Sequence, residues 1–170
     1  MRACAIFCRR RARSRIMTYH RSEVGPLAIV ISSRPIDAAD AEWVARLVNA
    51  YNVFVSDGGP VLHRVAPSAM QRAAAEVAAL ERLTGARLSH EVVLTSKRNS
   101  QRAHRKLAEV ALKIARRLNG VVDLTDLIDE LTVAHTITGH TSDGKPFEYH
   151  VATPETLESW MAHPRFRMAC

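Results

Sequence analysis

The chain of 170 residues has the length of a single domain, and its hydrophobic share of 47% can supply a buried core. No uninterrupted apolar run approaches the about 20 residues that a transmembrane helix needs, so the sequence predicts no membrane span. The net charge of +7 is unevenly divided: residues 1–24 hold seven Arg and one Glu, whereas the other 17 basic and 16 acidic residues nearly cancel. The basic isoelectric point is therefore no argument for nucleic-acid binding by the rest of the chain.

The first 24 residues form a basic tail that we predict to be disordered, followed by a single domain over residues 25–170. The tail does not match a secretory signal, because its apolar stretch is too short and its Arg cluster follows that stretch. One hypothesis is that translation begins at Met17, and another is that the tail contacts nucleic acid or anionic lipid. The three Cys (Cys4, Cys8 and Cys170) lie near the chain ends, which argues against a disulfide scaffold and favours a cytoplasmic location.

In chain order, the domain begins with a strand, a helix and a hairpin. Leu27–Ser32 is a continuous apolar run typical of a buried strand, and Asp37 can cap the helix that follows. Apolar residues at helical spacing predict its buried stripe: Val44, Leu47, Val48 and Tyr51. Residues 53–65 predict a hairpin with a tight turn at Asp57-Gly58, and Pro60 predicts that its second strand lies at an edge or begins beyond Pro60.

Two further helices enclose a short strand. Ser68 and Gln71 form a capping box for a helix from Ala69 to about Thr84, which Gly85 ends. Residues 91–95 predict a short strand. The strongest helix is capped by Asn99 or Ser100, extends to about Leu118 and is stopped by Gly120; its predicted core positions are Leu107, Val110, Ala111, Ile114 and Leu118.

The remainder predicts a brief strand over residues 121–124, then a hairpin of residues 131–138 and 147–152 around Asp143-Gly144. Thr153 caps a final short helix with Pro154 at its first position, and Pro164 ends it. This order of elements predicts an α+β fold. We expect a two-layer sandwich in which about four helices pack on a mixed, mostly antiparallel sheet.

The strongest helix and the segment after it carry opposite net charges: residues 97–117 carry a net +7 and residues 121–158 a net −7. One interpretation is a solvated helix face with polar loops; the other is a bipolar surface that docks a partner of opposite charge. A basic toxin would bind an acid-rich face, so we predict that the partner-binding residues are Asp123, Asp126, Asp129 and Glu130. The alternative, an anion- or nucleic-acid-binding surface, would use Lys97, Arg98, Arg102, Arg105, Lys106, Lys113, Arg116 and Arg117.

Two weaker patterns are candidates for chemical sites. The loop of residues 95–100 precedes a helix N-terminus and could hold a phosphate, although ordinary capping explains its Asn and Ser equally well. If Asp143-Gly144 is a two-residue turn, His135, Glu148 and His150 share one sheet face, but apolar neighbours on that face favour a core position over a metal site. The chain has no nucleophile elbow, zinc-protease motif, P-loop or dinucleotide fingerprint, so we predict no catalytic residue, metal or cofactor.

A family resemblance is carried by two stretches. Residues 103–124 place a basic amphipathic helix before NGVVDL, and residues 157–168 place a Trp-containing helix before HPRFRM. Together they resemble an uncharacterised, mainly actinobacterial family of small α+β proteins that are similar to immunity proteins of toxin systems. The resemblance implies a protein that binds and blocks a cognate toxin, with no catalytic residues to transfer.

We therefore expect a non-enzymatic binding protein, an immunity-type inhibitor with a protein partner. Homodimerisation through an edge strand is a further expectation. Two alternatives remain open. One is a nucleic-acid-binding protein that uses the basic helix 100–118 and the Arg-rich tail. The other is an enzyme with an unrecognised active site near the 95–100 loop or the His-containing hairpin.

Overall fold

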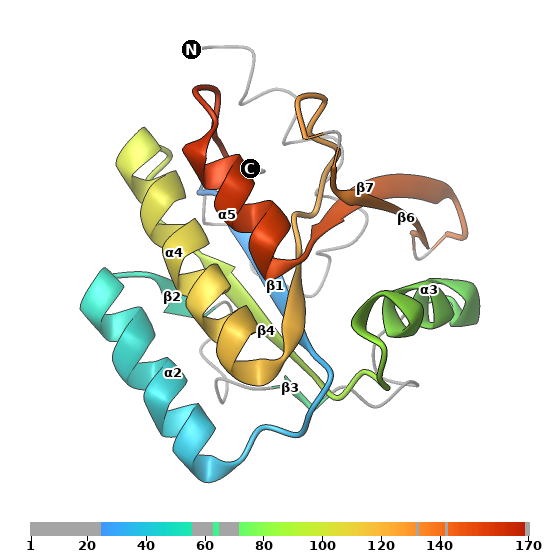
Figure 1. Ribbon diagram of the computed structural model, residues 1–170, viewed down its shortest axis with the longest axis horizontal. Helices are drawn as coiled ribbons and strands as arrows, with labels where there is room; N and C mark the ends of the chain where they lie inside the picture. The colour runs from blue at the N-terminus through green and yellow to red at the C-terminus, as the bar shows by residue number, and fades with distance from the viewer. Residues whose placement is uncertain (1–24, 56–62, 65–71, 132, 142, 169–170) are drawn as a thin grey trace.

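The computed structural model describes residues 25–55, 63–64, 72–131, 133–141 and 143–168. These residues form four helices and seven strands, five of which have four to seven residues (Figure 1). The helices are α2 (Ala38–Tyr51), α3 (Ala74–Thr84), α4 (Gln101–Leu118) and α5 (Pro154–Ala162). The strands are β1 (Leu27–Ser32), β2 (Phe54–Val55), β3 (His63–Arg64), β4 (His90–Thr95), β5 (Gly120–Asp123), β6 (His135–His140) and β7 (Pro146–Ala152).

The strands form one sheet in the order β2-β4-β1-β5-β7-β6, and β3 also pairs with β4. Each of the described strand pairs is antiparallel. The predicted α+β class, with helices packed on a mostly antiparallel sheet, is confirmed. The central strands β4, β1 and β5 are covered on both faces, which is why they read in the sequence as continuous apolar runs.

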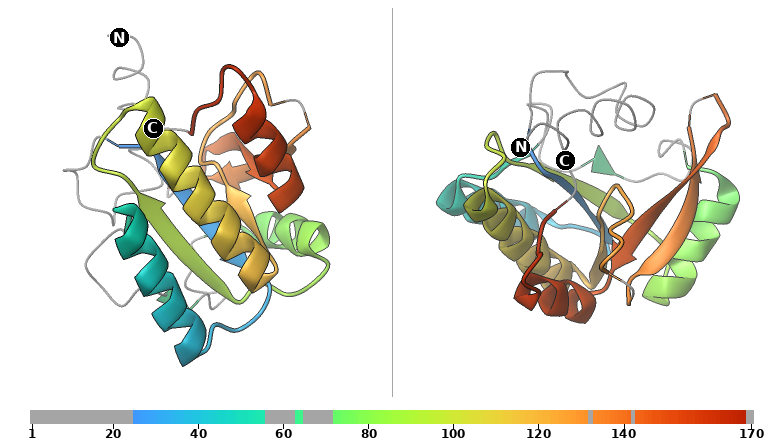
Figure 2. Two further views of the ribbon diagram at one scale, coloured as in Figure 1. Left: turned by 60° about the vertical axis from the view of Figure 1, so that its left-hand side comes forward. Right: turned by 90° about the horizontal axis from the view of Figure 1, so that it is seen from above.

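Helices α2, α4 and α5 form one layer against the sheet (Figure 2). On that face Val30, Val92 and Val122 pack with Leu107 and other apolar residues of the three helices. Helix α3 packs against the opposite face at the β6–β7 end, where Leu80 contacts a second cluster that contains Ile31, Val121, Ile137, Tyr149 and Val151. The domain therefore has its larger core under the three-helix layer and a smaller core under α3.

Helix α4 matches its prediction closely. The Ser100 hydroxyl accepts a hydrogen bond from the N–H of Ala103 at 3.2 Å, and all five predicted core positions are fully buried. The helix is ended by Asn119 in the left-handed conformation, so the predicted stop at Gly120 is wrong. Gly120 instead begins β5, where a Cβ atom would lie 2.3 Å from the carbonyl oxygen of Ile31.

The caps predicted for α2 and α5 are also confirmed. The Asp37 carboxylate accepts a hydrogen bond from the N–H of Asp40 at 2.7 Å, and the Thr153 hydroxyl accepts one from the N–H of Thr156 at 3.3 Å. Pro154 stands at the start of α5, as expected.

The predicted hairpin of residues 53–65 is wrong in its pairing. Phe54 pairs with Thr95 and His63 pairs with Glu91, so β2 and β3 both lie antiparallel to β4. Two segments that are antiparallel to the same edge run in the same direction and cannot be the two strands of one hairpin. The predicted turn at Asp57-Gly58 and the predicted edge residue Pro60 lie outside the described residues.

Helix α3 begins at Ala74 and not at Ala69, because Arg72 and Ala73 are not helical. Its cap position, Ala73, has extended backbone angles and no side-chain cap. The proposed capping residues, Ser68 and Gln71, lie outside the described residues. The predicted C-terminus is confirmed, since Gly85 follows Thr84 with a φ of 68°.

The register of the second hairpin differs by one residue from the prediction. His140 pairs with Pro146, and His150 pairs with Thr136. The turn is longer than two residues: the Gly144 N–H donates to the Thr141 carbonyl, the Thr141 N–H donates to the Lys145 carbonyl, and Gly144 has a φ of 79°. This is the pattern of a turn followed by a glycine bulge. The shift places His135 on the opposite face from Glu148 and His150, so the three residues do not share a face as a metal site would require.

No described helix combines the length and the apolar character needed to cross a membrane. The predicted disordered tail of residues 1–24 lies outside the described residues.

Candidate functional site

The four acidic residues predicted to bind a partner do not form one surface. Asp123 is fully buried at the end of β5, on the sheet face that α3 covers. Asp126 and Glu130 are half-buried and Asp129 is exposed, all three in the segment that follows β5. Asp123 therefore presents no carboxylate at the surface of the described structure, unlike the other three residues of the predicted set.

Asp123 belongs instead to a buried polar cluster centred on Arg72, whose side chain is 4% exposed. The Arg72 guanidinium lies 3.1 Å from Asp123 Oδ2 and 2.7 Å from Glu91 Oε1. It donates a hydrogen bond to the Tyr149 hydroxyl at 2.7 Å and also pairs with Glu76 on the first turn of α3. We call these five residues the Arg72 cluster.

Burial opposes the charge on Arg72, but the surrounding Glu91 and Asp123 carboxylates outweigh it and hold the pKa of this guanidinium well above its ordinary value. The cluster joins the entry to α3 to three strands: β4 through Glu91, β5 through Asp123 and β7 through Tyr149. It thereby fixes α3 over the smaller core. The contacts of Arg72 with the other four residues of the cluster thus lie inside the protein.

The Arg72 cluster is not among the sites predicted from the sequence. Two signals were present: Arg72 and Glu76 stand four residues apart, and Glu91 and Asp123 each interrupt or end an apolar strand. A charged residue at an inward position of a strand requires a buried partner. The sequence does not show which residue supplies that partner, because Arg72 is 51 positions from Asp123 and 77 from Tyr149.

An acidic face remains on the other side of the sheet, around His150. Burial is the main cause that lowers the pKa of His150, whereas the carboxylates of Asp129, Asp126 and Glu148 act in the opposite direction. The hydrogen bonds of His150 with Asp126 and Ile128 bring the segment of Asp126 and Asp129 to this imidazole, and Glu148 lies two residues before His150 in β7. We use the term acidic face for Asp126, Asp129 and Glu148.

The segment that carries Asp126 and Asp129 is fixed to β7 by its backbone. The N–H of Leu124 donates to the His150 carbonyl at 2.9 Å, and the N–H of His150 donates to the Asp126 carbonyl at 3.0 Å. The N–H of Ile128 donates to His150 Nδ1 at 3.1 Å, and Ile128 and Leu131 are buried in the larger core. The acidic face is therefore held by a rigid scaffold. Glu130 points elsewhere, with its carboxylate 3.7 Å from Arg165.

Four of the eight predicted basic residues make contacts with neighbouring helices and the C-terminal segment. The Arg105 guanidinium lies 5.7 Å from the Phe166 ring, and the Lys113 ammonium lies 4.6 Å from the Tyr51 ring. Arg116 pairs with Glu158 at 2.7 Å. The remaining four lie at or before the N-terminal half of α4, where Lys97, Arg98 and Arg102 are exposed and Lys106 is half-buried. The eight cations therefore do not form one uniformly free and exposed stripe.

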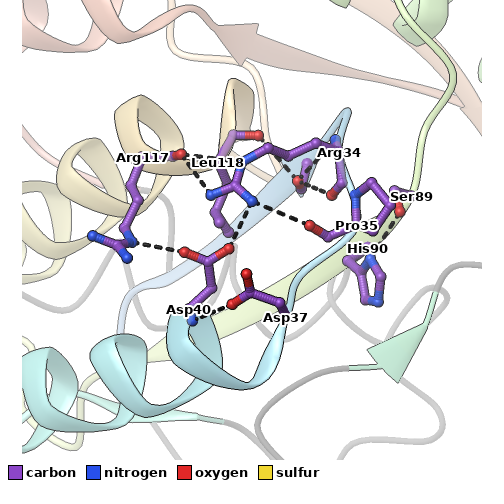
Figure 3. Close-up of polar contacts among 9 residues, drawn as sticks. Arg34, Pro35, Asp37, Asp40, Ser89, His90, Arg117 and Leu118 are labelled. Carbon is purple, nitrogen blue, oxygen red and sulfur yellow. Dashed lines mark hydrogen bonds and ion pairs between the residues drawn. The ribbon is translucent and has the colours of Figure 1, made fainter.

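Arg117 is held in a network between α4 and the start of α2 (Figure 3). Its guanidinium lies 2.8 Å from Asp40 Oδ1, and that of Arg34 lies 2.6 Å from Asp40 Oδ2. Arg34 also donates to the Arg117 carbonyl at 3.0 Å, which satisfies a backbone acceptor at the C-terminus of α4. The hydrogen bond from Arg34, followed by that from Arg117, lowers the pKa of the buried Asp40 carboxyl despite the opposing effect of burial.

The loop of residues 95–100 uses its polar side chains for local structure. Ser100 caps α4, and Asn99 Oδ1 lies 2.8 Å from Nε2 of the buried His104. In the part of the chain that the structure describes, no group of three or more His, Cys, Asp or Glu residues is arranged to hold a metal ion. The acidic face is thus the candidate site that combines exposure, charge and a fixed backbone.

Comparison with known proteins gives one match. The model of a family described as a family of unknown function, DUF6368, matches residues 20–169. Neither the curated proteins nor the solved structures contain a match to this chain.

Proposed function

Since the chain belongs to the DUF6368 family, whose function is unknown, we propose its function from its own residues: it is a non-enzymatic binding protein that holds a basic protein partner against the acidic face. The partner we propose is a cognate bacterial toxin, which the chain would neutralise as an immunity-type inhibitor. The observation that carries this proposal is that half-buried Asp126 and exposed Asp129 stand in a segment hydrogen-bonded to His150, two residues along β7 from exposed Glu148.

Charge complementarity supports this proposal. Exposed carboxylates that face a basic partner raise the association rate and disfavour partners of the wrong charge. The chain has a net charge of −7 over residues 121–158, and the acidic face concentrates part of that charge at one place. A basic enzyme that acts on nucleic acid presents the complementary surface, because it must attract phosphates.

Rigidity supports it as well. An inhibitor that blocks a partner tightly gains affinity when its binding surface is already in the bound conformation. The segment of the acidic face is fixed by the backbone hydrogen bonds of Leu124 and Ile128 to His150 and by the buried side chains of Ile128 and Leu131. Little ordering of this backbone would therefore accompany binding.

The test is affinity capture from a lysate of the native host with the tagged full-length chain, followed by washes of increasing salt. Three proteins are compared: the wild type, the variant Asp126→Asn/Asp129→Asn/Glu148→Gln, and the control Glu42→Gln/Asp143→Asn/Glu158→Gln. The control removes three carboxylates whose described partners are Arg46, Lys145 and Arg116 in surface ion pairs. We expect the wild type and the control to retain one basic protein that the acidic-face variant loses.

The captured protein is then produced alone, and its association rate with each variant is measured at low and high salt. Association with the wild type should be faster and more sensitive to salt than association with the acidic-face variant. Equal capture and equal rates for the two variants would show that the acidic face does not bind the partner. Arrest of the partner's toxicity by co-expression of the wild type would establish the inhibitor role.

Binding of nucleic acid is the second candidate, and it is favoured by the exposure of Lys97, Arg98 and Arg102 next to the N-terminus of α4. Four other basic residues of the predicted set are engaged with Phe166, Tyr51, Glu158 and Asp40, which weakens this alternative. Capture of nuclease-sensitive material whose affinity falls steeply with salt, and is reduced in Arg98→Gln/Arg102→Gln, would favour it over protein binding.

A further inference from the structure

The two edges of the sheet differ in how much backbone they offer to another strand. One edge consists of β2 and β3, which have two residues each and are separated along β4. The other edge is β6, a continuous strand of six residues that among the described strands pairs only with β7. Proteins commonly prevent an edge strand from pairing with another chain by means of Lys, Pro, a bulge or a short strand. The sequence of β6, HTITGH, contains no Lys or Pro.

The hydrogen-bond pattern between β6 and β7 shows which residues of β6 direct their backbone N–H and C=O groups away from β7. The Thr141 N–H donates to the Lys145 carbonyl, so this pair is hydrogen-bonded, and hydrogen-bonded pairs alternate with non-hydrogen-bonded pairs along an antiparallel ladder. The pairs of Thr136, Thr138 and His140 with β7 are therefore non-hydrogen-bonded. The N–H and C=O of His150, opposite Thr136, bond to residues 124 and 126, away from β6, as this alternation requires. Thr136, Thr138 and His140 thus direct their backbone N–H and C=O groups to the outer edge.

We propose that β6 is a dimerisation strand, which pairs antiparallel with β6 of a second copy of this chain about a twofold axis at Thr138. Each Thr138 then lies opposite Thr138 of the second copy, and Thr136 lies opposite His140 of the second copy. The outward groups of both strands form a ladder of about six hydrogen bonds across the axis. The result is one continuous sheet that extends through both copies.

The sequence of β6 suits pairing with itself. Twofold pairing places Thr opposite Thr at the axis, a favourable cross-strand pair, and places no like charges directly opposite each other. On the α3 face, Ile137 lies opposite Gly139 of the second copy. Glycine at position 139 is already favoured within one copy, because a Cβ atom there would lie 2.7 Å from the Phe147 ring, which would have to shift. On both sides of the axis, Ile137 of one copy therefore lies opposite Gly139 of the other without crowding.

The acidic face does not oppose this pairing. Glu148 pairs with Thr138 inside each copy, so the two Glu148 residues are separated by both β6 strands. Three strand spacings of about 4.8 Å place them about 14 Å apart, which exceeds the Debye length of about 10 Å at 0.1 M salt. Repulsion between the two carboxylates is therefore largely screened. The dimer also uses the edge of β6 and leaves the exposed acids of the acidic face outside the ladder.

The test compares Thr138→Pro with Thr138→Val by sedimentation equilibrium of the full-length chain. Proline removes the outward N–H of residue 138 without removing a bond to β7, and is tolerated at such positions of edge strands. Valine keeps the N–H and the β-branched shape. We expect the wild type and Thr138→Val to be dimers and Thr138→Pro to be a monomer with an unchanged circular dichroism spectrum. A monomeric wild type up to its solubility limit, or a Thr138→Pro variant that dimerises as the wild type does, would overturn the proposal.

Hydrogen exchange of the wild type decides the question independently, should Thr138→Pro fail to fold. In the proposed dimer the amides of Thr136, Thr138 and His140 exchange slowly at high protein concentration and rapidly on dilution. The amides of Ile137 and Gly139 are protected at both concentrations, since they face β7. Rapid exchange at Thr136, Thr138 and His140 in a dimeric sample would show that the copies associate through another surface.

Discussion

Nδ1 of His104 accepts a hydrogen bond from the backbone N–H of Met168 at 3.0 Å, and this bond joins the first turn of α4 to a residue 64 positions later. The other ring nitrogen, Nε2, lies 2.8 Å from Asn99 Oδ1 and donates to it. The segment after α5 is fixed further by the bonds of Gln101 Nε2 to the Phe166 carbonyl at 2.8 Å and of Trp160 Nε1 to the Arg167 carbonyl at 2.9 Å. The geometry requires a neutral His104, because a protonated Nδ1 could not accept the bond from Met168.

We predict that the chain loses stability as the solution becomes mildly acidic. Burial lowers the pKa of His104 and of His150 from the ordinary value of 6.5, and Arg167 adds to the effect at His104. The unfolded chain therefore binds protons at a higher pH than the folded chain. The free energy of unfolding should be greatest above pH 6.5 and should fall as the pH drops through and below 6.5. Urea unfolding at about pH 7.5 and about pH 5.5 measures this difference.

The variant His104→Gln separates the contribution of His104 from that of His150. It should be less stable than the wild type above pH 6.5, and its further loss of stability on acidification should be smaller. The residual loss belongs chiefly to His150 and should decrease again in His104→Gln/His150→Gln. A wild type whose stability does not change over this range would contradict neutral, buried imidazoles.

The second prediction concerns the Arg72 cluster. Replacement of Arg72 by Met leaves Glu91 and Asp123 without the guanidinium that lies 2.7 and 3.1 Å from them. Removal of one partner from a buried ion pair costs about 3–5 kcal/mol. Urea unfolding of Arg72→Met should show a loss of this size. The control Arg46→Met removes an exposed pair with Glu42 and should cost about 0.5 kcal/mol or less. Similar losses in the two variants would show that the cluster does not stabilise the fold.

The elements that the sequence predicted well are those whose signals are local. Helix α4 has its cap at Ser100, its apolar positions at helical spacing and a left-handed residue directly after Leu118, so its bounds follow within one residue. The same holds for Asp37 and Thr153 as caps of α2 and α5. These signals act over a few residues and do not depend on the rest of the fold.

The predictions that failed depend on contacts between distant parts of the chain or on the backbone conformation of a single residue. Both β2 and β3 pair with β4 and not with each other, which no pattern within residues 53–65 reveals. The left-handed Gly144 adds a bulge to the second hairpin, and this single residue moves His135 to the other face of the sheet. Asp123 appeared as one member of an acidic run, whereas it is buried in the sheet and pairs with Arg72, 51 positions away.

The third prediction concerns the contact between β1 and β5. A Cβ atom at Gly120 would lie 2.3 Å from the Ile31 carbonyl oxygen, which is backbone at the centre of the sheet and cannot move aside alone. Gly120→Ala should therefore destabilise the chain by about 1–3 kcal/mol, as overpacking does. Gly85→Asn is the matched control, because no atom lies within 4 Å of its added Cβ and Asn accepts the left-handed φ of 68°. Thermal unfolding that moves equally in the two variants would contradict this reading of Gly120.

The fourth prediction separates cations of α4 that stabilise the fold from those that do not. The Arg117 guanidinium contacts Asp40 and lies 4.8 Å from the centre of the Trp43 ring, and its side chain is still 41% exposed. Because solvent screens a partly exposed pair, Arg117→Gln should cost only about 1 kcal/mol. Arg102→Gln, at an exposed position of the same helix, should change stability by less than about 0.5 kcal/mol.

The two variants should also differ in how their stability changes at low pH. The pKa of Asp40 is lowered from 3.8, first by Arg34 and then by Arg117, so this carboxylate contributes stability above pH 3.8 that is lost as the pH falls through its folded-state pKa. Arg117→Gln removes one of the two cations, so its folded-state pKa for Asp40 should lie closer to 3.8 and its stability should fall less steeply in acid than that of the wild type. Arg102→Gln should follow the wild type at every pH. Identical acid profiles for all three proteins would show that Arg117 does not stabilise the Asp40 carboxylate, and would leave that role to Arg34 alone.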